Sequence, residues 1–216
     1  MTTGIHVRTR RPVAARSAAR AARRPLGGAD GNARLTAATG AVLLVLLAVE
    51  GATVPFLGAL LSVHIFVGML LLGPIALKLA STGYRLLRYY GGGREYVEHG
   101  PPAPLMRVLV APVLVASTIT LFGTGVGLLV LPGTGAIVGL HKASFAVWFF
   151  AMGIHVLAYG LKMWCRLLPG VASARIGGGW LRVGVVGVAL AVGLLVAVKT
   201  FPLAAPWLYG ALRWDS

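Results

Sequence analysis

The sequence predicts an all-helical integral membrane protein with about five transmembrane helices. Its 216 residues are 57% hydrophobic and only 12% charged, whereas a soluble domain carries about 25% charged residues. The mean hydropathy of +0.84 reflects the same excess of apolar side chains. Several apolar stretches reach the length of about 20 residues that a helix needs to cross the hydrocarbon core. The lipid bilayer is therefore the first partner that the sequence predicts.

The first apolar stretch, from Leu35 to Leu77, is too long for a single span and contains a turn signal. Its only ionisable side chains are Glu50 and His64. Pro55 disfavours helix in the residue before it, so we expect a turn between Glu50 and Pro55. This turn separates a helix near 35–52 from a helix near 56–80. Glu50 then lies at the outer end of the first helix, where it is expected to be an interfacial carboxylate, with a proton or quinone site as the alternative.

Three further helices are predicted downstream, and the segments around them carry helix breakers. Glycine or proline clusters occur at 91–93, 101–102, 132–133 and 169–170 and mark loops. We expect helices near 106–131, 140–164 and 182–200, which complete a transmembrane domain over 35–200. Residues 1–34 lack apolar periodicity and are predicted to be a disordered basic tail. Residues 201–216 are predicted to be a short outer tail.

The basic residues predict the orientation. The net charge is +15, with 20 Lys and Arg against five Asp and Glu. With a cytoplasmic N-terminus, 17 of the 20 lie on the inner side and three (Lys142, Lys199 and Arg213) lie outside. This asymmetry follows the positive-inside rule. It predicts a multi-pass protein of the cell (inner) membrane, and it argues against nucleic-acid binding, which needs a continuous basic face.

The histidines are the most informative candidates for a site, because ionisable groups within membrane spans are costly and often functional. His141 and His155 are 14 residues apart, which places them on nearly the same helix face and about 21 Å apart along the axis. His64 lies about nine residues after Pro55, and His141 lies about nine residues after Pro132. We therefore expect the two histidines at a similar depth in the membrane. An imidazole from each of two neighbouring helices can hold a haem iron.

A second site at the level of His155 is predicted to be incomplete. The residue 14 positions after His64 is Lys78, which offers an amine instead of an imidazole. We expect this lysine to extend its amine toward the interface. Gly68 and the glycines of Phe122-Gly-Thr-Gly-Val-Gly127 would allow a macrocycle to approach the backbone, or helices to pack closely.

The segments His64-Ile-Phe-Val-Gly68, Leu140-His141-Lys142 and Gly153-Ile-His155 resemble the haem-bearing helices of bacterial membrane b-type cytochromes. These include the cytochrome b561-like proteins and the cytochrome b subunits of hydrogenases and formate dehydrogenases. The resemblance covers about 56–165 and implies a four-helix haem-binding core, with haem b ligated by His64 and His141 and with His155 as a candidate ligand of a second haem. It also implies electron transfer to a redox partner subunit or a quinone. The family pattern usually supplies four such histidines, and this chain has three.

Two other functions fit the same sequence. A cofactor-free membrane scaffold or assembly protein would use the histidines as interhelical hydrogen-bonding groups, and a small transporter would use them along a transport path. No motif for catalysis or nucleotide binding is present, so no catalytic residue is predicted. An electron-transfer subunit is expected rather than a stand-alone enzyme.

Overall fold

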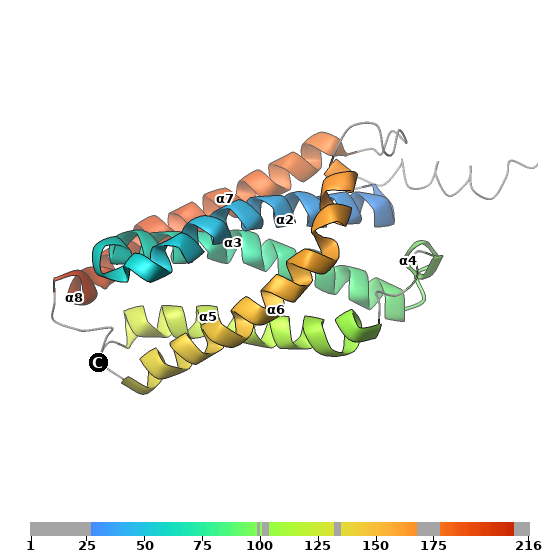
Figure 1. Ribbon diagram of the computed structural model, residues 1–216. Coiled ribbons are helices and arrows are strands. Elements are labelled where there is room, and N and C mark those ends of the chain that lie inside the picture. The colour runs from blue at the N-terminus through green and yellow to red at the C-terminus, as the bar shows by residue number, and fades with distance from the viewer. Residues whose placement is uncertain (1–26, 99, 101–103, 132–134, 168–177, 210–216) are drawn as a thin grey trace, which may run out of the picture.

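The computed structural model describes residues 27–98, 100, 104–131, 135–167 and 178–209. All regular structure in these residues is helical, in long rods that lie side by side (Figure 1). Four helical stretches are long and apolar enough to cross a membrane: Gly28–Tyr90, Met106–Val130, Gly135–Gly160 and Gly179–Leu208. The first of them turns back on itself, so the bundle has five long legs. The predicted all-α membrane fold is confirmed.

The turn in the first stretch lies where the proline predicts it. Helix α2 (Gly28–Thr53) ends at the short 3-10 helix η1 (Val54–Phe56), and α3 (Leu57–Tyr90) returns alongside α2. Two side-chain hydrogen bonds close the far end of this hairpin. The Asn32 amide donates to the Ser81 carbonyl at 3.1 Å, and the Thr36 hydroxyl donates to the Ser81 hydroxyl at 3.1 Å.

Both helices of the hairpin are longer than predicted. Helix α2 begins at Gly28, so the proposed tail over 1–34 is too long by its last seven residues; residues 1–26 lie outside the described part. The early start follows from tertiary contacts, since Asn32 and Leu35 are buried against the rest of the bundle. Helix α3 continues ten residues beyond the predicted end at 80, because the Tyr-, Leu- and Arg-rich segment after Ser81 supports helix until the first glycine, Gly91.

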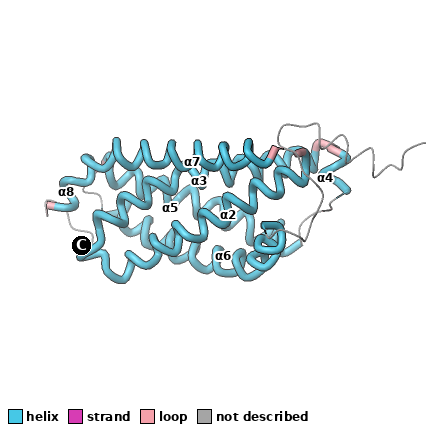
Figure 2. Tube along the Cα trace, turned by 90° about the horizontal axis from the view of Figure 1, so that it is seen from above, coloured by secondary structure: helices cyan, strands magenta, loops and turns pink. Residues whose placement is uncertain are grey.

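The remaining legs lie close to the predicted ranges. A short helix, α4 (Arg94–Glu98), follows α3. The π-helical turn η2 (Met106–Val110) leads into α5 (Ala111–Val130), which pairs with α6 (Gly135–Leu167). Helix α7 (Gly179–Thr200) packs along α3, as the view from above also shows (Figure 2).

The first residues of the predicted C-terminal tail are helical. Residues Phe201–Ala204 form the 3-10 helix η3 and Ala205–Leu208 form α8. The Trp207 indole is buried and donates to the Leu128 carbonyl of α5 at 2.9 Å. This segment therefore caps one end of the bundle; residues 210–216 lie outside the described part.

Helices α3 and α7 cross at two glycines. A Cβ added at Gly73 would lie 2.8 Å from the Gly193 backbone nitrogen and would overlap the Ala189 carbonyl, and one added at Gly193 would overlap the Leu70 carbonyl. Pro74 has no N–H to donate to Leu70 four residues earlier, so the same carbonyl is free to face α7. Small residues allow this close approach in membrane helices.

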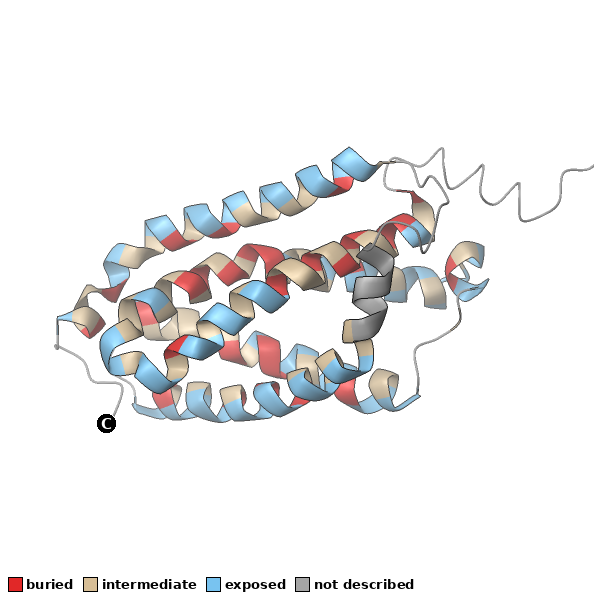
Figure 3. Cartoon of the chain, turned by 45° about the horizontal axis from the view of Figure 1, so that its top comes forward, coloured by how far each residue is buried: buried red, intermediate tan, exposed pale blue. Residues whose placement is uncertain are grey.

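The outward faces of the legs are apolar. The exposed residues include many large hydrophobic ones, such as Leu157, which is 84% exposed. Exposed positions, in pale blue, run along the outside of the helices in Figure 3. The buried positions include hydroxyl-bearing residues such as Thr39, Ser117 and Thr118. Apolar outside and partly polar inside is the pattern expected where lipid replaces water as the solvent.

Candidate functional site

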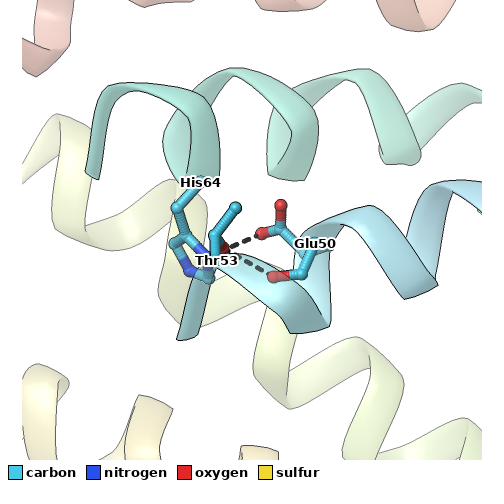
Figure 4. Close-up of polar contacts among 3 residues, drawn as sticks. All are labelled: Glu50, Thr53 and His64. Carbon is cyan, nitrogen blue, oxygen red and sulfur yellow. Dashed lines mark hydrogen bonds and ion pairs between the residues drawn. The ribbon is translucent and has the colours of Figure 1, made fainter. Parts of the chain in front are cut away.

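His64 lies between the two helices of the hairpin, with its ring directed toward the end of α2 (Figure 4). Its Nδ1 atom is 2.8 Å from the Thr53 hydroxyl oxygen and 3.1 Å from Glu50 Oε1. Both partners lie in the last turn of α2, so the turn at Val54–Phe56 brings them opposite the start of α3. The side chains of His64 and Glu50 are only 22% and 15% exposed.

The hydrogen bonds of Thr53 identify the tautomer of His64. The Thr53 hydroxyl donates its single hydrogen to the Glu50 backbone carbonyl at 2.5 Å. Its oxygen can therefore only accept from the imidazole, so Nδ1 carries the hydrogen. In the neutral ring the lone pair is then on Nε2, which has no hydrogen-bond partner among the described residues.

His141 on α6 has a similar contact with α5. Its Nδ1 atom is 3.0 Å from the Thr124 hydroxyl of α5. Thr124 donates its hydrogen to backbone carbonyls of its own helix, those of Thr120 at 2.7 Å and Leu121 at 3.0 Å. By the same reasoning His141 carries its hydrogen on Nδ1 and its lone pair on Nε2. The His141 ring also has a hydrogen bond with the Leu121 backbone of α5.

The two histidines lie at the same level of the bundle. His64 and His141 are close enough for their charges to interact. Their helices, α3 and α6, run in the same direction (Figure 1). We call this group, with Glu50, Thr53 and Thr124, the His64–His141 level.

A second polar level lies 14 residues further along the same helices. Lys78 and His155 are close enough for electrostatic interaction. The Lys78 amine donates to the Thr36 backbone carbonyl of α2 at 2.7 Å, so it bonds inside the bundle instead of extending freely to the interface. The His155 ring packs against Tyr159 with 5.1 Å between ring centroids. This Lys78–His155 level contains one imidazole, as the sequence spacing indicates.

Two of the glycines make room for the histidine sites. A Cβ on Gly125 would lie 3.3 Å from His141 Cε1, and a Cβ on Gly68 would lie 3.3 Å from Glu50 Oε1. Gly123 and Gly153 have open space instead. The glycines next to the site therefore contact the histidine or its partner.

The aromatic residues between His141 and His155 separate into two groups. The Trp148 indole is buried and donates to the Thr118 hydroxyl of α5 at 3.1 Å, so it joins α6 to α5. Phe149 is 60% exposed and lies on the outward face. Trp148 is thus a core residue, and Phe149 faces lipid.

The donor set consists of two imidazoles. Among the described residues there is no group of three or more His, Cys, Asp or Glu side chains placed to hold a metal, and a protein-held zinc site needs at least three such ligands. Two imidazoles could serve as the protein ligands of a haem, whose porphyrin supplies four further ligands. Each Nδ1–H also has an oxygen partner, as metal-ligating histidines usually do.

The sequence pointed to the histidines but not to their partners. Thr53 and Thr124 were not among the predicted site residues, and Glu50 was expected at the interface. The available signals were the one-turn spacing of Glu50 and Thr53 and the position of Thr124 between two glycines. No protein-family model, curated protein or solved structure matches this chain.

Proposed function

We propose that this protein is a membrane b-type cytochrome subunit in which His64 and His141 would hold one haem b. The observation that supports the proposal is the shared arrangement of the two imidazoles. They come from parallel helices, lie at one level and each donate Nδ1–H to a threonine oxygen. Both Nε2 atoms are left as lone-pair donors, which is the state that a neutral axial ligand requires.

The residues of the chain would set the properties of the site. Haem b, when bound, supplies a reversible one-electron couple. Thr53 and Thr124 hold the imidazole planes, and the apolar surroundings exclude water. Electrons would pass to or from a redox partner subunit or a quinone in the bilayer. His155 is a candidate ligand of a second haem, for which Lys78 stands in place of the partner imidazole.

The orientation proposed for the bundle follows the charge asymmetry of the sequence. A cytoplasmic N-terminus in the cell membrane places the His64–His141 level in the outer half of the bilayer. A topology reporter fused after Ser216 should then be active on the outer side, and one inserted at Gly92 should be active in the cytoplasm. A cytoplasmic C-terminus would contradict this orientation.

The first test of the function is the absorption spectrum of the protein purified in detergent. A haem b protein is red, with a Soret band and a sharp α band after reduction. Pyridine haemochrome analysis should give one haem per chain. A colourless preparation that takes up no added haemin would contradict the proposal.

A cofactor-free scaffold is the second candidate, and one observation favours it. The contacts among Glu50, Thr53 and His64 already join α2 to α3 without any ligand. In that case His64 contributes only interhelical hydrogen bonds. A cofactor-free scaffold would be colourless, and His64→Asn or His64→Gln should then leave its fold intact.

A further inference from the structure

Helix α3 extends past the level at which α7 begins. The two helices run in opposite directions (Figure 1) and cross where Gly73 lies against residues 189–193 of α7. About eleven residues from this crossing, α7 reaches Trp180 and α3 reaches Tyr84. Trp180 is 91% exposed, and tryptophan at the end of a span typically lies at the membrane–water interface. Residues 85–90 of α3 therefore lie beyond the hydrocarbon core.

This end of α3 is long enough to cross the layer of lipid headgroups. Six helical residues extend about 9 Å, and the headgroup layer on each side of the hydrocarbon is about 5–8 Å thick. The segment contains Arg85 and Arg88 together with Leu87 and Tyr90, which are 74% and 65% exposed. Guanidinium groups and exposed apolar side chains at one height suit the boundary between phosphates and acyl chains.

Helix α4 folds back onto this segment after a three-glycine turn and adds another arginine. Tyr96 of α4 is only 4% exposed and packs edge-on against Tyr84, with 6.0 Å between the ring centroids. The Arg88 guanidinium carbon lies 6.0 Å from the centroid of the Tyr96 ring. These contacts hold α4, with its exposed Arg94, beside the end of α3. We call residues 84–98 the α3–α4 corner.

The surroundings of the α3–α4 corner are positively charged. Helix α2 begins beside it, because the Asn32 amide donates to the Ser81 carbonyl and α2 contacts α4. Residues 1–26, which precede α2 in the sequence, contain seven arginines and no Asp or Glu. Within the corner, three arginines outnumber the two acids, Glu95 and Glu98. An anionic lipid surface attracts basic residues that lie within a Debye length of it.

We propose that the α3–α4 corner binds the headgroups of anionic phospholipids in the leaflet at this end of the bundle. Its arginines contact the lipid phosphates, and Leu87 and Tyr90 contact the upper part of the acyl chains. A lipid fits better than an acidic soluble protein, because the exposed apolar side chains lie at the height of the guanidinium groups. The proposal does not depend on haem and holds equally for a colourless protein.

Native mass spectrometry of the detergent-solubilised protein, titrated with phosphatidylglycerol or phosphatidylcholine, tests this proposal. The unchanged protein should bind phosphatidylglycerol more tightly. The combined variant Arg85→Gln, Arg88→Gln and Arg94→Gln should bind it at least about fivefold more weakly, the effect of losing one basic contact near an anionic surface. The matched control is Lys142→Gln with Lys199→Gln, two exposed lysines at the opposite end, and it should bind like the unchanged protein.

A single variant covers the case in which the combined variant fails to fold. Arg94→Gln changes an exposed side chain and should still weaken phosphatidylglycerol binding several-fold. Equal affinity in the folded arginine variants and the unchanged protein would overturn the proposal. So would a preference lost only on deletion of residues 1–26, which would place lipid binding in that segment. Inorganic phosphate should not displace the lipid; displacement at equal concentration would indicate a site for a free anion instead.

Discussion

The His64–His141 level and the Lys78–His155 level share three helices but have different chemistry. Both use α2, α3 and α6, separated by 14 residues on α3 and on α6, and the first also uses Thr124 of α5. At the first level each imidazole donates to a threonine oxygen. At the second, an amine donates to a backbone carbonyl and the single imidazole packs on a tyrosine. Residues at the same depth lie close together at both levels. Only at the first level does a hydrogen bond from Nδ1 to a side-chain oxygen leave the Nε2 lone pair of each imidazole able to act as a ligand.

The largest loss of stability is expected from a change at the contact between α3 and α7, because α3 carries residues of both levels. Gly73 lies between His64 and Lys78 on α3 and packs against Gly193 of α7. In Gly193→Leu the side chain would collide with the Leu70 backbone, which cannot move as a side chain can. We expect a loss of stability at or above about 3 kcal/mol, the upper end of overpacking costs, and little folded protein.

Gly187→Leu is the matched control, because a Cβ at Gly187 meets nothing within 4 Å. Size-exclusion chromatography and thermal unfolding in detergent would compare the two variants. Equal stability of Gly193→Leu and Gly187→Leu would show that the glycine crossing does not hold α3 in place.

Lys78→His should reduce the difference between the levels. It supplies the missing imidazole opposite His155, and the Thr36 carbonyl that now accepts from the amine can accept from a ring N–H. The haem content should rise from one toward two per chain, measured by pyridine haemochrome analysis. A folded variant that stays at one haem would show that the amine is not what distinguishes the Lys78–His155 level.

Gly125→Ala should weaken the His64–His141 level selectively. The added Cβ would lie 3.3 Å from His141 Cε1, so the ring must shift by a few tenths of an ångström against Thr124. We expect up to about a tenfold loss of haem affinity, as for other disturbed ligand orientations. Gly123→Ala, where a Cβ meets nothing within 4 Å, should titrate with haemin like the unchanged protein, and identical weakening in both would contradict a specific effect on His141.

Much of the fold was predictable from the sequence because lipid imposes simple rules. The lengths of the apolar segments predicted the five long helices, and Pro55 predicted the turn between α2 and α3. The helix ends were less predictable: Ser81 looked like the start of a loop, yet its hydroxyl and carbonyl bind α2 and the helix continues to Tyr90. The crossing of α3 and α7 depends on how the helices are rotated, although Ala189, Gly193 and Ala197 on α7 have the spacing of a small-residue contact.

The candidate site was predictable only in part. The positions of the histidines in the sequence predicted that His64 and His141 lie near each other and that Lys78 lies near His155. The threonine partners depend on three-dimensional placement, because Thr53 and Thr124 contact the imidazoles only after the helices have packed. Each hydroxyl then acts as the acceptor, since its single hydrogen is already donated to a backbone carbonyl. The pairing of Glu50 with His64 likewise needs the turn at Val54–Phe56 to bring the end of α2 against α3.

The account is tested most directly by the reduced-minus-oxidised absorption spectra of His141→Ala and His155→Ala. His155 is about 21 Å from His141 along α6, beyond the reach of one iron atom. His155→Ala should therefore keep the low-spin spectrum of one haem per chain, and His141→Ala should lose it or turn it high-spin. A spectrum that survives in His141→Ala and disappears in His155→Ala would contradict the assignment of the haem to the His64–His141 level.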